Sequence, residues 1–361
     1  MKRRLILVIG DHSGGPGYII DSLFNNLNDF DEIIFISLKS RKLNIKNKKY
    51  NKKIKKVRFY GFFNSVRYLL ISSLKRKDKN IIFAFDNLGF IYGLFYKILT
   101  NSLFIIRISG FVGPVSWKYY YINKLIVNYF ADKVVVNTKS LKKHIRGLFP
   151  KSQPIVIYNG IKLIKSKQLN NFSSPIHYGS KDINIIHLAN FYNSIKGHKS
   201  SLEIVKRLLN KGINVQLNFV GDGVLLRSIE ELSNEMDISE NVNFLGYLGD
   251  SKKINQIRKN DICLNPSFTE SFGIGVLECM RQGLPVVGSN VPGFNEVVLT
   301  NYNGILCDKN KVSTFVDAIE FLINNPDVYK QYSFNSKKRS FLFSEERMII
   351  SYKKLFNQLL K

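Results

Sequence analysis

The sequence predicts an α/β fold in which two doubly wound domains follow one another, each a parallel sheet with helices on both faces. Short apolar runs typical of buried parallel strands alternate with segments of helical spacing throughout the 361 residues. A glycine-rich loop follows a strand in each half, at residues 13–17 and 271–275. A polar stretch rich in Lys, Asn and Ser separates the halves. We therefore expect a first domain over residues 1–165, a linker over 166–182 and a second domain over 183–339.

The formal charge of +27 leaves three classes of partner open: nucleic acid, an anionic membrane surface and anionic small substrates. Abundant Lys and Asn alongside Ile also fit a compositional bias of the source, so the charge alone does not select among them. The three cysteines are widely spaced and have no companion His cluster. This pattern argues against a zinc site and favours a reduced, cytoplasmic setting.

Two apolar segments resemble membrane signals, but their details favour a soluble fold. Residues 5–9 follow three basic residues, yet this run is about half the length that an export signal needs and no small-residue cleavage pattern follows it. Residues 87–106 carry Lys97 and are interrupted by glycines, so they fall short of the roughly 18 to 20 uncharged residues of a spanning helix. We predict a buried strand at 5–9 and a buried helix followed by a strand at 87–106.

The first domain is predicted from its strands and from the loop after the first strand. Residues 13–17 form a glycine loop that opens a helix, an arrangement that brings backbone amides close to phosphate but also fits a tight turn. Residues 29–31 spell Asp-Phe-Asp, as some metal sites do, but they lie at the wrong end of the sheet and are predicted to be a turn. Further strands are expected at residues 32–38, 81–85, 103–108 and 133–137.

The most basic part of the chain, residues 39–58, leaves two interpretations open. It has six lysines between residues 48 and 56 and no acidic residue. Lysines keep a loop or an edge strand soluble, or they attach a protein to acidic lipid at about 1 kcal/mol for each basic residue near the surface. Nucleic acid ranks below both, because Tyr50 is the single aromatic residue among these lysines. Residues 62–74 fit an amphipathic helix, which would suit a membrane surface.

The second domain is predicted from a strand at residues 183–188 onward. Lys196 precedes a helix around residues 202–209, and a basic residue there can neutralise a diphosphate; an ordinary surface lysine is the alternative. The remaining elements are strands at 215–220, 242–248, 261–266 and 304–306, and helices around 316–322 and 344–359.

Residues 265–296 contain the main candidate site, which includes two carboxylates, Glu270 and Glu278. A strand ends at residue 266, and a helix is predicted over residues 274–281. The loop between them offers free N–H groups at the positive end of the helix dipole, which predicts an anion site. Carboxylates beside it would repel phosphate but suit hydroxyl groups, so the combination predicts a nucleotide sugar. The alternative is that Glu278 stabilises the helix N-terminus and Glu270 caps it.

The run from Glu270 to Glu278, followed by Gly283-Leu-Pro-Val-Val-Gly and Gly293-Phe-Asn-Glu, resembles the donor-binding signature of glycosyltransferase family 4. These are the retaining enzymes of the GT-B fold within glycosyl transferases group 1. The resemblance implies two Rossmann-like domains facing across a cleft, with residues 340–361 crossing back to the first domain.

The resemblance also implies roles for individual residues. Glu270 would lie against the donor sugar and Glu278 would hold the ribose. The backbone amides of Phe272, Gly273 and Ile274 would meet sugar and phosphate.

Four further residues take roles by the same resemblance. Gly15 would belong to a loop that faces the diphosphate, and Leu248 would lie where the nucleotide base is contacted. Lys196 would meet the diphosphate without the Arg that family members carry a few residues before it, with Lys199 as an alternative. Ser109 stands where the family has a His. The catalytic candidates are therefore Glu270, Lys196 and Ser109.

We expect a retaining hexosyltransferase of the 2.4 class that uses a UDP- or GDP-sugar and a saccharide or polyprenyl-linked acceptor. No metal or other cofactor is expected, because helix N-termini, Lys196 and glycine amides can meet the phosphate charge. The resemblance implies that the leaving phosphate deprotonates the acceptor on the same face.

The expected setting is the synthesis of a bacterial surface polysaccharide, such as O-antigen, capsule or exopolysaccharide. We expect a cytoplasmic protein with peripheral attachment to the anionic inner face of the plasma membrane, and no nucleic-acid partner. Two alternatives stay open: a GT-B nucleotide-sugar hydrolase or epimerase, and a non-catalytic basic protein that binds membrane or nucleic acid.

Overall fold

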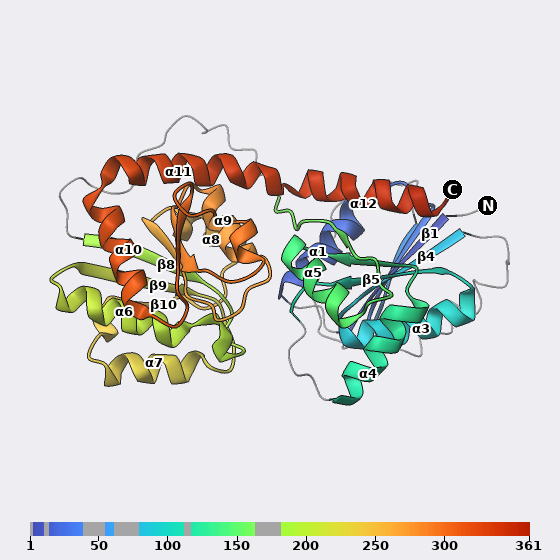
Figure 1. The fold of residues 1–361 in the computed structure, drawn as a ribbon, viewed down its shortest axis with the longest axis horizontal. Coiled ribbons are helices and arrows are strands. Elements are labelled where there is room, and N and C mark those ends of the chain that lie inside the picture. Colours follow the sequence, from blue (N-terminus) through green and yellow to red (C-terminus); the bar gives the residue numbers. More distant parts are fainter. Residues whose placement is uncertain (1–2, 11–13, 39–54, 61–78, 112–116, 163–181) are drawn as a thin grey trace. The chain divides into compact units, whose positions relative to one another are not determined.

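The computed structural model of the chain describes residues 3–10, 14–38, 55–60, 79–111, 117–162 and 182–361 (Figure 1). The chain divides into two compact units. Unit 1 comprises Met1–Gly160 and Glu345–Lys361, and unit 2 comprises Ile161–Ser344. The chain therefore returns to unit 1 at its last helix, α12 (Glu345–Leu359). The predicted amphipathic helix at 62–74 and nearly all of the predicted linker lie outside the described residues.

Unit 1 is built on a parallel sheet with the strand order β3-β2-β1-β4-β5-β6-β7. The order reverses between β1 and β4, which pair from Arg3↔Lys79 to Ile9↔Phe85, so the topological switch point lies at the carboxyl ends of these two strands. The strands are β1 (Arg3–Ile9), β2 (Glu32–Ser37), β3 (Lys55–Tyr60), β4 (Lys79–Phe85), β5 (Leu103–Ile108), β6 (Lys133–Val136) and β7 (Ile155–Val156). The end of the basic stretch 39–58 thus lies in an edge strand, β3.

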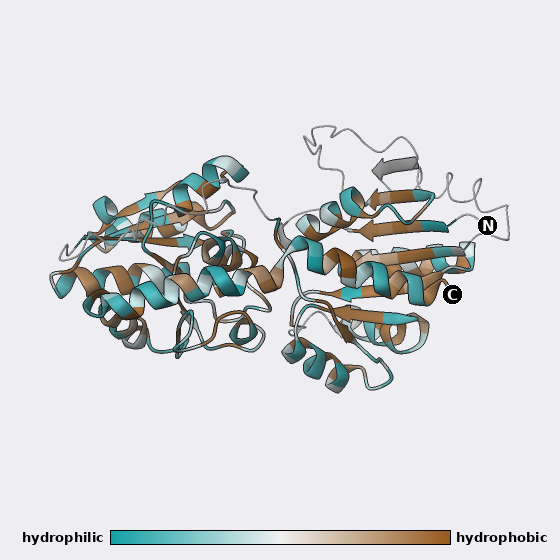
Figure 2. Cartoon of the chain, turned by 90° about the horizontal axis from the view of Figure 1, so that it is seen from above, coloured by the Kyte–Doolittle hydropathy of each residue, from teal (hydrophilic) through white to brown (hydrophobic). Residues whose placement is uncertain are grey.

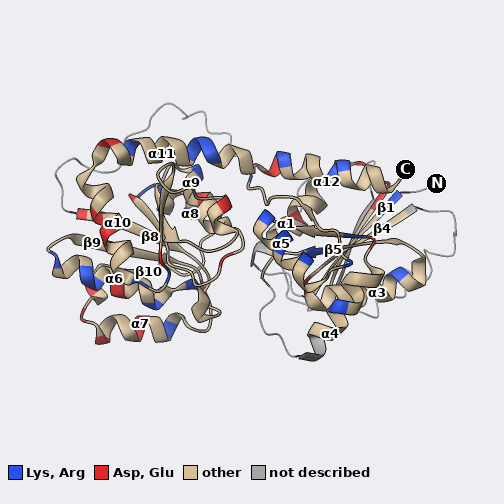
Figure 3. Cartoon of the chain, in the orientation of Figure 1, with Lys and Arg blue, Asp and Glu red and all other residues tan. Residues whose placement is uncertain are grey.

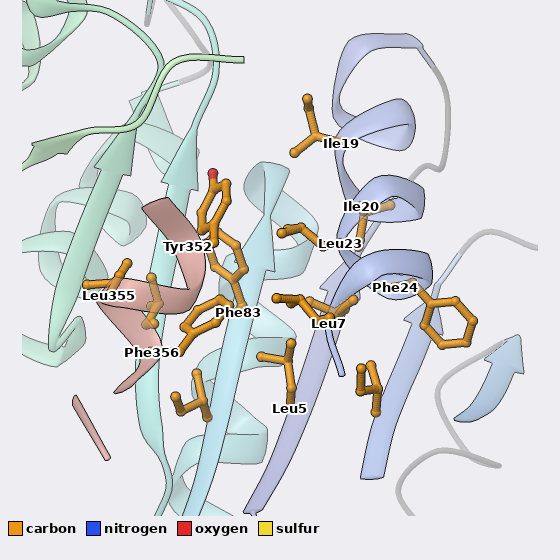
Figure 4. Close-up of a cluster of buried hydrophobic side chains, with 14 of the residues drawn as sticks. Leu5, Leu7, Ile19, Ile20, Leu23, Phe24, Phe83, Tyr352, Leu355 and Phe356 are labelled. Atoms are coloured by element: carbon orange, nitrogen blue, oxygen red, sulfur yellow. The ribbon is translucent and has the colours of Figure 1, made fainter. Parts of the chain in front are cut away.

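Helices cover both faces of this sheet because its strands are apolar on both sides (Figure 2). On one face, Leu7 and Phe83 pack with Leu23 of α1 (Gly14–Asn26) and Phe356 of α12 (Figure 4). The opposite face is covered by α3 (Asp86–Thr100), α4 (Trp117–Leu125), η1 (Ile126–Phe130) and α5 (Lys139–Leu148).

The predicted glycine loop at residues 13–17 differs in one respect from the structure. Helix α1 begins at Gly14, so Gly15 lies in the first helical turn and not in a loop before it. Its amide is still one of the N-terminal N–H groups that have no acceptor within the helix. The turn predicted at residues 29–31 is present, and it joins α1 to β2.

Unit 2 has a parallel sheet with the order β10-β9-β8-β11-β12-β13, and its switch point lies between β8 and β11. Its strands are β8 (Asp182–Leu188), β9 (Asn214–Val220), β10 (Val242–Phe244), β11 (Ile262–Asn265), β12 (Val286–Ser289) and β13 (Gly304–Cys307). The helices are α6 (His198–Asn210), α7 (Leu226–Glu235), α8 (Asp250–Ile257), α9 (Ile274–Arg281), α10 (Val312–Asn324) and α11 (Pro326–Ser340), with the short η2 (Ser194–Lys196), η3 (Ser239–Asn241), η4 (Phe294–Glu296) and η5 (Phe341–Phe343).

Helix α11 was not predicted from the sequence. The residues that it buries are mostly polar, among them Tyr329, Asn335 and Ser336. Tyr329 donates its hydroxyl proton to the Asp261 carbonyl, and Ser336 donates to the Asn303 carbonyl. A helix is recognised in a sequence by apolar residues that recur about every 3.6 positions. Because the buried face of α11 is made mostly of hydrogen-bonding side chains, the sequence does not show this pattern.

Candidate active site

The switch point of unit 2 is lined by two loops that pack directly on each other. The loop after β8 contains η2, and the loop after β11 leads to α9. The Phe268 N–H donates to the Ile195 carbonyl at 2.8 Å. Gly197 has a φ of +74°, and a Cβ atom built there would lie 2.1 Å from the Pro266 carbonyl oxygen. Glycine at position 197 is therefore what allows the two loops to touch.

Lys196 and Glu270 face each other across this switch point. The Lys196 Nζ and Glu270 Oε2 atoms are 2.6 Å apart. The second carboxylate oxygen, Oε1, accepts the Phe272 N–H at 3.3 Å. Sequence reasoning placed both residues at the phosphate and sugar end of one site, and the structure brings them together as a partly exposed ion pair.

The helix N-terminus beside this pair is shaped by glycines. Gly273, the residue before α9, has a φ of +83°, and no side chain caps the helix there. The alternative in which Glu270 caps the helix is therefore wrong, because its carboxylate accepts the Phe272 amide instead. The Phe272 side chain is buried and packs edge-on against Phe343, which leaves backbone amides, including that of Ile274, as the donors at this end of α9.

Glu278, one turn inside α9, pairs with a lysine that the sequence analysis did not identify. The Lys253 Nζ of α8 lies 2.6 Å from Glu278 Oε1 and 3.7 Å from the exposed Asp250 carboxylate. Burial raises the pKa of Glu278, and the Lys253 charge opposes that rise. Burial lowers the pKa of Lys253, but the Glu278 carboxylate outweighs it and the net shift is upward. Lys253 thus counteracts the effect of burial on Glu278, and Glu278 stabilises the charged form of Lys253.

The loop before α8 carries Leu248, the predicted contact for the base. Leu248 is half-buried, whereas the neighbouring Tyr247 is 80% exposed. Tyr247 is close enough to Lys253 to act on its pKa. The loop therefore lies near the Lys253–Glu278 pair.

Two stacked histidines support the loop that carries Lys196. His198 stacks on Phe191 at 3.9 Å and on His187 at 4.8 Å between ring centroids. His187 Nδ1 lies 2.9 Å from the Ser201 hydroxyl. Burial, with Lys196 adding to it, lowers the pKa of His198 to about 4, although a backbone hydrogen bond to Ala189 opposes this. Burial also lowers the pKa of His187 well below its usual value, so both rings are neutral at pH 7.

Unit 1 arranges its own switch point around Asp86. Both carboxylate oxygens of Asp86 lie 3.0 Å from the Gly10 nitrogen, and Oδ1 also accepts the Gly89 N–H at 2.8 Å. Asp86 has a φ of +60°, a conformation rare for residues other than glycine. Its carboxylate thus joins the start of α3 to Gly10, at the end of β1.

Ser109, at the end of β5, lies beside a buried arginine. The Arg107 Nε donates to the Ser109 hydroxyl at 3.1 Å, and its other nitrogens donate to the Tyr352 hydroxyl and Asn159 Oδ1. These three partners of Arg107 are all uncharged. The Ser109 hydroxyl is therefore already engaged in a network that attaches α12 to the sheet of unit 1.

Among the described residues, no group of three His, Cys, Asp or Glu side chains is arranged to hold a metal ion. Asp29 pairs with Lys353, and Asp31 accepts the Arg3 N–H at 2.8 Å, so these two aspartates tie chain segments together. Within the same described ranges, no helix combines the length and apolar character needed to cross a membrane.

Two doubly wound parallel sheets in succession define a GT-B architecture, and solved structures agree. Sucrose-phosphate synthase from Thermosynechococcus elongatus matches with a TM-score of 0.81 and 18% identity, covering 99% of both chains. Anabaena HepE in complex with UDP-glucose matches with a TM-score of 0.78 and 16% identity, covering 99% of this chain and 100% of the other. These similarities confirm the predicted fold.

Residues 173–339 match the family model of "Glycosyl transferases group 1". An uncharacterized glycosyltransferase from Methanocaldococcus jannaschii is 28% identical over 63% of this chain and 60% of its own length. Protein CapJ of Staphylococcus aureus is 26% identical over 80% of this chain and 75% of its own length. The O-antigen biosynthesis glycosyltransferase WclY of Escherichia coli is 26% identical over 64% of this chain and 63% of its own length. Two of these three matches therefore span less than two thirds of the relative's length. Residues 173–339, most of which lie in unit 2, are therefore similar to glycosyl transferases group 1, the group that the sequence resembles.

Proposed function

We propose that the protein is a retaining glycosyltransferase that moves a hexose from a nucleoside-diphosphate sugar to a saccharide or lipid-linked saccharide. One observation carries the proposal: Lys196, Glu270 and the free amides of α9 meet at the switch point of unit 2, one helical turn from Glu278. Cation and amides suit a diphosphate, and the carboxylates suit hydroxyl groups on either side of it.

The donor assignment draws support from the solved structures. HepE was crystallised with UDP, with UDP and glucose, and with UDP-glucose. UDP-hexoses are therefore the first donors to test, followed by GDP-hexoses. The relative WclY, an O-antigen biosynthesis glycosyltransferase, supports a role in the synthesis of a surface polysaccharide.

In the proposed reaction, the bond between the anomeric carbon and the diphosphate oxygen breaks, and its electron pair leaves with the phosphate. The leaving phosphate takes the proton of the acceptor hydroxyl, whose oxygen bonds to the same face of the sugar. Lys196 and the α9 amides stabilise the negative charge that develops on the diphosphate. Glu270 orients the hexose, and no metal ion is required.

A panel of UDP- and GDP-sugars tests this proposal through the melting temperature of the protein. A ligand at 100 times its Kd stabilises the folded state by about 2.7 kcal/mol. We expect one or a few nucleotide sugars to raise the melting temperature, with EDTA leaving the rise unchanged. If no nucleotide sugar raises it, the proposal is wrong. Release of free sugar without any acceptor would favour a hydrolase, and an inverted anomeric configuration in the product would contradict retention.

A surface of unit 1 supports a lipid-linked acceptor. Three elements that pack together, α3, α4 and η1, expose large apolar side chains. Basic residues accompany them, since Lys97 lies on α3 and Lys124 lies on α4 (Figure 3). Lys151 lies over the Tyr129 ring at 4.3 Å. The exposed apolar residues, here called the apolar surface, are Phe95, Ile98, Tyr121, Ile122, Leu125, Tyr129 and Phe130.

Apolar and cationic groups together suit the interface of an anionic bilayer. Sedimentation with vesicles tests this part of the proposal. Vesicles containing phosphatidylglycerol should bind the protein, and phosphatidylcholine vesicles should bind it weakly. The triple variant Ile98→Ser/Leu125→Ser/Tyr129→Ser should lose most of the binding. The matched control Val224→Ser/Phe334→Ser removes exposed apolar residues from unit 2 and should bind normally. Equal binding by all three proteins would exclude this surface.

A further inference from the structure

Lys253 is brought to the candidate donor site by the fold alone. It lies on α8, 25 residues before Glu278, and nothing in its sequence surroundings singles it out. Its Nζ approaches one oxygen of Glu278, Oε1, at 2.6 Å. Among the described residues, Glu278 Oε2 has no hydrogen-bond partner. One oxygen is therefore held by the protein while the other is available to a ligand.

This arrangement differs from that of the other carboxylate. Glu270 has both oxygens engaged, one by Lys196 and one by the Phe272 amide. A ligand hydroxyl that binds Glu270 must share or replace those contacts. A hydroxyl that binds Glu278 can use the free oxygen while Lys253 keeps the carboxylate in place.

We propose that Lys253 is a positioning residue of the donor site, which holds the Glu278 carboxylate ionised and oriented so that Oε2 accepts a ribose hydroxyl. The inference rests on the proposed function, because it requires that Glu278 meets the ribose. A charged acceptor makes a stronger hydrogen bond to a hydroxyl than a neutral carboxyl group does. Loss of Lys253 would leave a mostly buried carboxylate without its counter-ion, which favours protonation.

The other charged and titratable groups near this pair are accounted for. Asp250 lies on α8 with its side chain exposed, so water screens its charge. Tyr247 lies on the loop before α8. The buried thiols Cys263 and Cys279 lie on β11 and α9. A hydrogen bond to Cys263, together with burial, holds the pKa of Cys279 well above its usual value. Lys253 is thus the cation in direct contact with Glu278 among the described residues.

The test measures the Kd of UDP, and of 2′,3′-dideoxy-UDP, by titration calorimetry between pH 6 and 9. The full-length wild type and the variants Lys253→Met, Lys253→Arg, Glu278→Gln and Asp250→Asn are compared. If GDP-sugars and not UDP-sugars stabilise the protein, GDP and 2′,3′-dideoxy-GDP are used in place of UDP and 2′,3′-dideoxy-UDP. For Lys253→Met we expect UDP to bind about tenfold more weakly at pH 7, which corresponds to about 1.4 kcal/mol, and to regain affinity as pH rises. Dideoxy-UDP should bind wild type and Lys253→Met equally.

The controls separate positioning from folding. Lys253→Arg retains the positive charge and should restore the wild-type pH profile, and Asp250→Asn should match wild type. If Lys253→Met binds UDP normally at every pH, or weakens UDP and dideoxy-UDP equally, the inference is wrong. If Glu278→Gln binds UDP and dideoxy-UDP as wild type does, Glu278 does not hold the ribose and the donor assignment itself fails. If Glu278→Gln no longer binds UDP more tightly than dideoxy-UDP, but Lys253→Met still does, only the inference about Lys253 fails.

Discussion

The switch points of the two sheets share a topology but differ in chemistry. In unit 2, two charged side chains, Lys196 and Glu270, meet across the reversal of strand order. In unit 1, the corresponding carboxylate, Asp86, accepts backbone N–H groups of Gly10 and Gly89. A ligand can exchange for a partly exposed side-chain pair more readily than for backbone hydrogen bonds. Side chains in unit 2 are thus available for chemistry, whereas Asp86 joins the start of α3 to the end of β1.

Replacement of Glu270 should have the largest effect on activity. Glu270→Gln keeps the shape of the side chain but removes the charge that pairs with Lys196. We expect the rate of sugar transfer to fall by a factor of about 10² to 10³, in the range found when one stabilising group of an active site is lost. Glu230→Gln, on the exposed side of α7, serves as the control and should retain the wild-type rate. A Glu270→Gln enzyme with more than half of the wild-type rate would contradict the role assigned to this carboxylate.

Gly197→Ala tests whether close packing of the two loops builds the site in unit 2. The new Cβ would meet the Pro266 carbonyl, and the backbone would be strained at a φ of +74°. We expect a destabilisation of about 3 kcal/mol, measured by chemical denaturation. Gly212→Ala is a matched control, since Gly212 has a φ of +75° but open space around its Cβ position. It should cost about 1 kcal/mol. Similar losses in the two variants would show that the contact with Pro266 is unimportant.

Acid should weaken unit 2 through His198. Because burial lowers the pKa of His198 to about 4, the unfolded chain binds a proton at a higher pH than the folded chain does. The stabilisation is complete above the unfolded pKa of about 6.5 and is lost as pH falls toward 4. Between pH 7 and 5 we expect a loss of about 2 kcal/mol, seen in the denaturation midpoint.

His198→Phe keeps an aromatic ring between Phe191 and Phe219 but cannot titrate. It should have a flatter stability profile over the same pH range. An unchanged slope would mean that other groups cause the acid sensitivity.

Asp86→Asn should produce the smallest change, and it should be confined to unit 1. The amide keeps one acceptor oxygen, so we expect a local loss of about 1 kcal/mol. Hydrogen exchange at the Gly10 amide should accelerate, while the amides of α9 should be unaffected. Asp327→Asn, at an exposed side chain of α11, is the control. Equal acceleration of hydrogen exchange in both units would contradict the different roles of the two switch points.

The sequence predicted the strands around both switch points because buried parallel strands are continuous apolar runs, as at residues 81–85 and 183–188. It also predicted α9 and the positions of Glu270 and Glu278 relative to it. The partners of the carboxylates were harder to predict. Lys196 was identified from its place before a helix and from a family resemblance, but its contact with Glu270 joins residues 74 positions apart.

Lys253 could not have been found by the same means. It is one of 54 basic residues, and only its contact with Glu278 in the folded chain distinguishes it. Helix α11 was missed because its buried face is polar. The roles of Gly15, Ser109 and Leu248 toward ligands stay predictions.

The central claim is tested most directly by a crystal structure of the protein with its nucleotide sugar bound. We predict that the hexose hydroxyls lie within hydrogen-bonding distance of Glu270, that the ribose hydroxyls lie within hydrogen-bonding distance of Glu278, and that the diphosphate lies at the N-terminus of α9 beside Lys196. A nucleotide bound elsewhere, with neither carboxylate in contact with a sugar hydroxyl, would contradict the account.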